Sequence, residues 1–95
     1  MAELIAIGNT AVDSSPFTVA EGAPKTLYIK STNNGPCHDV LFMLQKQQSN
    51  GTTYQDVLGL DRSNINEKGK IVGAGTFRVQ RRASTINSAG MDIEG

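Results

Sequence analysis

Short stretches of alternating apolar and polar residues, separated by turn residues, run along most of the chain. In the clearest example Phe77, Val79 and Arg81 share one side, and the residues between them share the other. A period of two is typical of a strand with one buried face. Comparable β-prone runs predict further strands over residues 4–7, 17–20, 25–31, 39–48 and 52–60.

Turn residues separate these runs at regular intervals. Asp13-Ser-Ser-Pro16 and Glu21-Gly-Ala-Pro24 are two such clusters, and Asn50-Gly51 predicts a hairpin turn because glycine adopts positive φ without strain. An amphipathic helix over Val40–Gln48 is the rival interpretation, since the apolar run is continuous there; the Asn-Gly turn that follows favours a strand. With about seven or eight short strands, the pattern predicts an all-β fold, a single antiparallel β-sandwich of the Ig-like or jelly-roll kind.

The 95 residues are expected to form one domain over residues 1–95. Residues 1–8 hold an apolar run that could extend as an arm and add to another subunit's sheet, or could pair within its own sheet. Alternation is lost after Arg82. Residues 83–95 are therefore predicted as a C-terminal tail, with a final edge strand around Ile86 or Met91–Ile93.

Charge and composition narrow the range of partners. Nine basic and nine acidic residues give a formal net charge of +0, so no overall field attracts nucleic acid or an anionic membrane. The single cysteine excludes an internal disulfide. The N-terminus lacks the pattern of a signal peptide, and no stretch approaches the roughly 20 apolar residues of a membrane helix. We therefore expect a protein made in the cytoplasm, with neither a membrane nor nucleic acid as its partner.

Residues that could carry catalysis are few. Cys37-His38-Asp39 combines suitable residue types, but neighbouring residues of a strand point to opposite faces, and the chain has no second histidine. Gly69-Lys70 and Gly73-Ala-Gly75 lack the complete phosphate-loop pattern and are better explained as backbone corners. We expect no enzymatic activity, no metal and no cofactor.

Three weaker surface patterns suggest other ligands. A basic strip could be formed by Arg78, Arg81 and Arg82, together with Lys30 and Lys46. Such a strip would suit single-stranded nucleic acid. The favoured interpretation is that these residues lie on a solvated sheet face.

Tyr28 and Tyr54 could form a platform for a sugar. Asn50-Gly51-Thr52 matches the N-glycosylation pattern, which the turn already explains. A monomeric ligand-binding module for a carbohydrate or an extended peptide is therefore the alternative function.

The order of motifs resembles a known group of proteins. Pro24-Lys-Thr-Leu-Tyr-Ile-Lys30 is followed by Val40-Leu-Phe-Met-Leu-Gln-Lys-Gln47, then by Ser49-Asn-Gly51 and finally by Gly73-Ala-Gly-Thr-Phe-Arg-Val79. Over residues 17–82 this is similar to the small β-sandwich virion proteins of tailed bacteriophages, of the head decoration or cement type.

The resemblance implies a non-enzymatic protein that binds the assembled phage head, clamps neighbouring major capsid subunits or other virion subunits, and forms a homotrimer on the capsid surface. The group has no shared active-site motif. For such a protein, strand edges and chain ends are the expected contacts. The predicted partner-binding residues are Leu4, Ile5, Ile7, Arg78, Arg81, Arg82, Met91 and Ile93.

Overall fold

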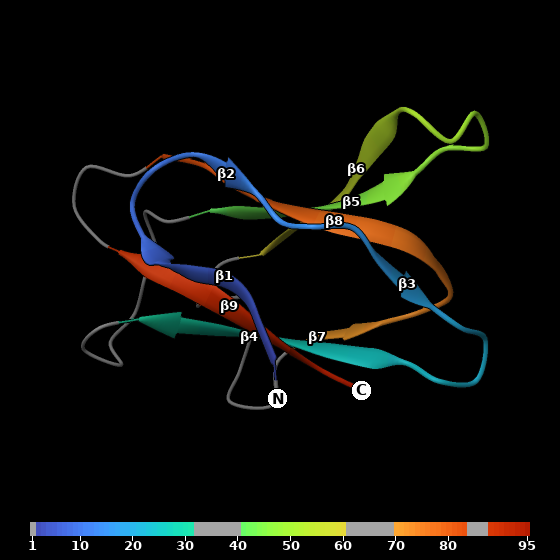
Figure 1. Cartoon of the computed structure of the whole chain (residues 1–95), viewed down its shortest axis with the longest axis horizontal. Helices are drawn as coiled ribbons and strands as arrows, with labels where there is room; N and C mark the ends of the chain where they lie inside the picture. Colours follow the sequence, from blue (N-terminus) through green and yellow to red (C-terminus); the bar gives the residue numbers. More distant parts are fainter. Residues whose placement is uncertain (1, 32–40, 61–69, 84–87) are drawn as a thin grey trace.

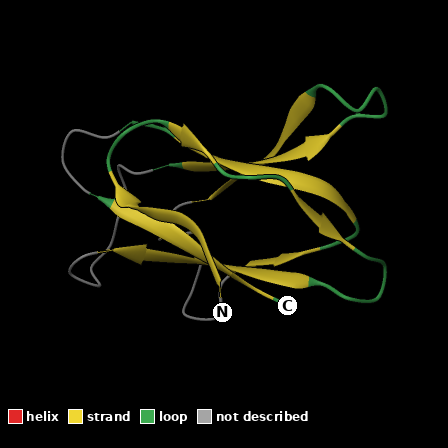
Figure 2. Cartoon of the chain, in the orientation of Figure 1, coloured by secondary structure: helices red, strands yellow, loops and turns green. Residues whose placement is uncertain are grey.

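Two antiparallel sheets make up the computed structural model, which describes residues 2–31, 41–60, 70–83 and 88–95 (Figures 1 and 2). Sheet A has the order β1 (Ala2–Gly8), β9 (Ala89–Glu94), β4 (Lys25–Ser31) and β7 (Lys70–Val72). Sheet B has the order β2 (Val12–Asp13), β8 (Gly75–Arg81), β5 (Phe42–Gln47) and β6 (Tyr54–Leu60), and β3 (Phe17–Val19) also pairs with β8.

The predicted fold class is confirmed. The described residues form nine strands and no helix, and every strand pair is antiparallel. Residues 42–47, for which a helix was the rival interpretation, form β5 at the centre of sheet B. Cys37-His38-Asp39, Gly69 and Ile86 lie outside the described residues.

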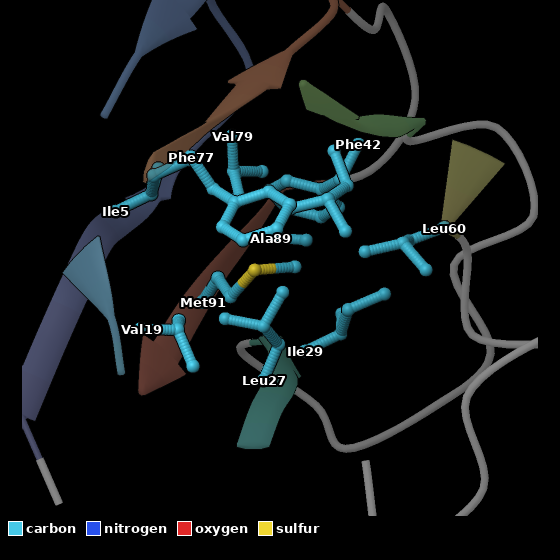
Figure 3. Packing of buried hydrophobic residues seen from close by; sticks show 11 residues of the cluster. Ile5, Val19, Leu27, Ile29, Phe42, Leu60, Phe77, Val79, Ala89 and Met91 are labelled. Atoms are coloured by element: carbon cyan, nitrogen blue, oxygen red, sulfur yellow. The ribbon is translucent and has the colours of Figure 1, made fainter. Parts of the chain in front are cut away.

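The core lies between the inner faces of the two sheets (Figure 3). Alternation along β4 buries Leu27 and Ile29, while β8 contributes Phe77 and Val79 from the opposite sheet. The buried cluster comprises Ile5, Val19, Leu27, Ile29, Phe42, Leu44, Leu60, Phe77, Val79, Ala89 and Met91. Fully burying one such large side chain contributes about 1.5–3 kcal/mol, so this cluster is the main source of stability.

The segments at the two ends of the chain pair with each other. β1 pairs with β9, from Ala2 opposite Ile93 to Gly8 opposite Ala89, so the N-terminal run pairs within its own sheet. The strand predicted around Met91–Ile93 is confirmed as β9, but its prediction as an edge strand in a tail is wrong, because β9 lies between β1 and β4 in the interior of sheet A. Small residues at 89 and 90 conceal the alternation there.

Close approach of β1 explains Gly90. The register of β1 against β9 shifts twice, between Glu3 and Ile5 and between Ile5 and Gly8. These irregularities bring the β1 backbone over Gly90. A Cβ at that position would lie 2.5 Å from the Ile5 carbonyl oxygen and 2.8 Å from the Ile7 nitrogen. Only glycine fits there without displacement of the backbone.

Ser14 connects β2 to β3 along the same side of β8. Its backbone N–H donates to the Val79 carbonyl at 2.8 Å, and its hydroxyl accepts from the Val79 N–H at 2.9 Å. The hydroxyl therefore replaces a backbone carbonyl at the point where the ladder is interrupted before Pro16. The chain thus bends between two short strands without leaving the backbone of Val79 unpaired.

The turn predicted at Asn50-Gly51 is confirmed. Gly51 has a φ of 77°, and its N–H donates to the Gln48 carbonyl at 3.0 Å. The Asn50 side-chain oxygen accepts from the backbone N–H groups of Thr52 and Thr53. The loop joins β5 to β6 in a hairpin that diverges from sheet A at the upper right of Figure 1.

Candidate interaction surface

A network of polar side chains covers the outer face of sheet B. We call this surface the polar face and define it by Asp13, Gln45, Tyr54, Asp56, Arg78, Gln80 and Arg82. Its members come from β2, β5, β6 and β8, together with the residue that follows β8. Alternation along β8 places Arg78 and Gln80 on the side opposite to the buried Phe77 and Val79.

Arg78 lies at the centre of this network. Its Nε donates to Gln45 Oε1 at 2.7 Å, and its guanidinium carbon lies 4.3 Å from the centroid of the Tyr54 ring. Its Nη1 is 3.8 Å from Asp13 Oδ2. A planar guanidinium stacked on an aromatic ring and bonded at its edge has few alternative rotamers. Arg78 is therefore held in place before any partner binds.

Acidic side chains balance the arginines of the polar face. Gln45 donates to Asp56 at 2.8 Å, and Arg82 Nη2 lies 3.8 Å from the other Asp56 oxygen. Asp13 accepts from Gln80 at 3.0 Å. The polar face thus holds two arginines and two aspartates. The basic strip considered from the sequence is not assembled, because Arg81 is buried inside the sandwich and Lys30 belongs to sheet A.

Arg81 extends into the sandwich, in the direction that the alternation predicted. The residue is only 4% exposed, and its side chain donates to three backbone carbonyls. Nε donates to the Thr10 carbonyl at 2.8 Å. Nη1 donates to the carbonyls of Ala6, at 2.6 Å, and Ala89, at 2.8 Å. Burial lowers the pKa of Arg81. It therefore ties β8 of sheet B to β1 and β9 of sheet A and is not free to contact a partner.

The outer face of sheet A carries an ion-pair cluster. Lys30 Nζ lies 2.7 Å from both Asp92 Oδ1 and Glu3 Oε2, and the hydrogen bonds to Asp92 and Glu3 raise the pKa of Lys30. Partial desolvation, followed by the Glu94 carboxylate, raises the pKa of Tyr28. The cluster joins β1, β9 and β4 across the face of the sheet.

We predict that this cluster makes stability fall at alkaline pH. The folded pKa of Lys30 is above the ordinary 10.5, so its contribution is complete below pH 10.5 and is lost as the pH rises through the folded value. The raised pKa of Tyr28 likewise makes the folded state less stable as the pH rises. The free energy of unfolding, measured by urea titration at several pH values, should decline less steeply for Lys30→Gln. An equal decline in both proteins would contradict the assignment. Since Lys30 is partly exposed, the difference should stay within about 1 kcal/mol.

Exposed large hydrophobic side chains of the described residues fall into two pairs. Ile7 and Val12 are 42% and 38% exposed, and Val57 and Leu58 are 54% and 37% exposed. The first pair flanks the connection from β1 to β2, which we call the crossover edge (residues 7–12). The second pair lies on β6. Because β2 and β6 end the strand order of sheet B, Val12 lies at the opposite edge of that sheet from Val57 and Leu58, while Ile7 lies on β1 at the end of sheet A.

The predicted partner-binding residues divide into three groups. Ile5, Met91 and Arg81 are buried within the chain, so their side chains do not reach the surface. Leu4 and Ile93 are partly buried against the core. Ile93 also lines an open depression of about 340 Å³ with Ala2, Lys25, Glu94 and Gly95.

The third group, Ile7, Arg78 and Arg82, reaches the surface. Sequence reasoning missed Val12, Val57 and Leu58. They look like ordinary strand residues, and only the order of the strands in space places them at edges.

The remaining ligand hypotheses find little support in the geometry. Tyr28 lies on the outer face of sheet A and Tyr54 on the outer face of sheet B, so the two rings do not form one sugar platform. Within the described ranges, no group of three or more His, Cys, Asp or Glu residues could hold a metal ion. The same part of the chain contains no helix long and apolar enough to cross a membrane.

Comparison of the chain with protein-family models, with curated proteins and with solved structures finds no match.

Proposed function

We propose that this chain is a non-enzymatic structural protein of a phage particle, which binds the outside of the assembled head and clamps neighbouring shell subunits. The virion setting rests on the resemblance of residues 17–82 to small β-sandwich decoration proteins. The structure contributes a surface suited to such contact. That surface joins the crossover edge to the polar face.

The observation that carries the proposal is an apolar edge continued by an ordered polar network. Val12 pairs with Arg81 and therefore lies on the inner side of the β2 edge, whereas its neighbour Asp13 pairs with Gln80 on the polar face, so the apolar and polar parts meet around this edge. Protein interfaces combine a small apolar centre with a polar rim of satisfied hydrogen bonds. Because Arg78 is already fixed by Gln45 and Tyr54, little side-chain entropy is lost on docking.

Repetition on a lattice strengthens such a contact. Each copy would offer only two exposed apolar side chains at this edge, Ile7 and Val12. When many equivalent sites are occupied and each copy contacts two shell subunits, the second contact is intramolecular and gains effective concentration. A modest surface can then hold a shell together.

The experiment begins with a density gradient of lysate from the native source, searched for this chain by intact mass. Co-sedimentation with large particles in many copies supports the proposal. The purified chain is then added back to particles from which it has been removed. Ile7→Asp and Val12→Asp should each reduce the bound fraction at least tenfold, because a charge would be buried at the contact.

Gln48→Asp, in the exposed hairpin loop, is the matched control and should bind like the wild type. Unfolding curves of all three variants establish that each is folded. A chain that stays at the top of the gradient, or edge variants that bind like the control, would overturn the proposal. Deletion of residues 1–8 is a poor test, since β1 supplies Ile5 to the core.

A further inference from the structure

β6 is an edge strand with less protection against pairing than the other described edge strands, although it has one bulge, at Val57. Natural edges are defended by bulges, prolines, short length or charged side chains. β1 has two register shifts, β2 and β3 have two and three residues with Pro16 between them, and β7 has three residues. β6 has seven residues, one register shift, no proline and no basic residue.

The side of β6 away from β5 combines apolar side chains with backbone groups that no described strand pairs. No described strand pairs with β6 on the side away from β5. Alternate residues of an antiparallel strand direct their N–H and C=O groups to each side, so part of the β6 backbone faces outward. Val57 is the extra residue of the register shift between Leu44 and Gln45, and it is 54% exposed.

The charged side chain of β6 does not prevent another strand from pairing with this edge. Asp56, the acidic residue of β6, accepts from Gln45 at 2.8 Å and lies 3.8 Å from Arg82. Its neighbours Val57 and Leu58 are apolar and exposed. The edge is therefore complementary to another extended strand with apolar residues and without an unpaired charge.

We propose that β6 pairs with β6 of a second copy of this chain across a two-fold axis, so that the two B sheets become continuous. A two-fold axis places a strand antiparallel to itself. A register centred on Val57 sets Val57 opposite its own copy and Asp56 opposite Leu58, so like charges do not meet. The formal net charge of +0 adds no long-range repulsion between copies.

The test is sedimentation velocity of the whole chain over a range of concentrations. The wild type should dimerise with a Kd of roughly micromolar order, as expected for a small interface. Val57→Lys should weaken dimerisation at least tenfold, because the two introduced ammonium groups would face each other at the axis. Gln55→Lys, also exposed on β6, should weaken it by a smaller factor. Thr18→Lys, at an exposed position of β3, which pairs with β8 and not with β6, is the matched control and should leave the Kd unchanged.

Unfolding curves and circular dichroism establish that each variant is folded, and Gln55→Lys carries the test if Val57→Lys does not fold. A wild type that is monomeric throughout, a trimer of the kind implied by the resemblance, or equal effects of Val57→Lys and Thr18→Lys would overturn two-fold pairing. These outcomes leave head binding through the crossover edge untouched, since that binding is measured on particles with other variants.

Discussion

Replacing Gly90 with alanine is expected to destabilise the chain by about 4 kcal/mol or more, which places it among the largest effects of single substitutions. The added Cβ would lie within 3 Å of backbone atoms of Ile5, Ala6 and Ile7. No rotamer change relieves a backbone clash, so β1 must move away from β9. That movement takes Ile5 out of the core, which costs about 2–3 kcal/mol, and breaks ladder hydrogen bonds worth about 1 kcal/mol each.

Urea unfolding followed by circular dichroism measures this effect, and Gly73→Ala is the matched control. A Cβ at Gly73 would have no atom within 4 Å, and Gly73 is not among the glycines with positive φ. The control should change the free energy of unfolding by less than about 1 kcal/mol. Alanine lowers the conformational entropy of the unfolded chain, so the change should be stabilising. Equal midpoints for Gly90→Ala and the wild type would show that β1 does not lie over Gly90.

Arg81→Met should cost at least about 3 kcal/mol. The guanidinium is the donor for the carbonyls of Ala6, Thr10 and Ala89, and methionine has no donor to replace it. A buried carbonyl left unpaired costs about 1–3 kcal/mol; the hydrogen bond to Ala89 is buried, and those to Thr10 and Ala6 are partly buried and cost less. A buried ion pair can sometimes be exchanged for apolar residues without loss, but here the acceptors are backbone atoms that no substitution removes.

Arg82→Met provides the comparison for Arg81→Met in the same unfolding experiment. Arg82 is the next residue in the chain, its side chain is 51% exposed, and its described ion pair with Asp56 is long, at 3.8 Å. The expected change is within about 0.5 kcal/mol. If the two variants were equally stable, the inward position of Arg81 would be refuted.

The local sequence pattern is sufficient to predict side-chain burial where a strand has one buried and one exposed face. Alternation predicted which side of β8 holds Phe77 and Val79, and it placed Arg81 with them. The Asn50-Gly51 turn was predictable for a similar reason, because the backbone conformation depends on residues within the turn.

Features that depend on distant parts of the chain could not be predicted. The acceptors of Arg81 are backbone carbonyls, which leave no mark in a sequence. The sequence does not predict that β9 is an interior strand, because Gly90 is required by the close backbone of β1 rather than by the two faces of a sheet. The exposure of Val57 follows from the place of β6 in the strand order, which is a property of the whole sandwich.

The position of β9 also constrains the order in which the molecule can be made. β9 lies between β1 and β4, so these two strands have no common neighbour until residues 89–94 have left the ribosome. Closing so long a loop makes pairing slow, and unpaired strands are prone to aggregation in the meantime. A nascent or prematurely terminated chain would present β1 and β4 as open edges. Synthesis of β9 is thus the event that allows β1 to join sheet A.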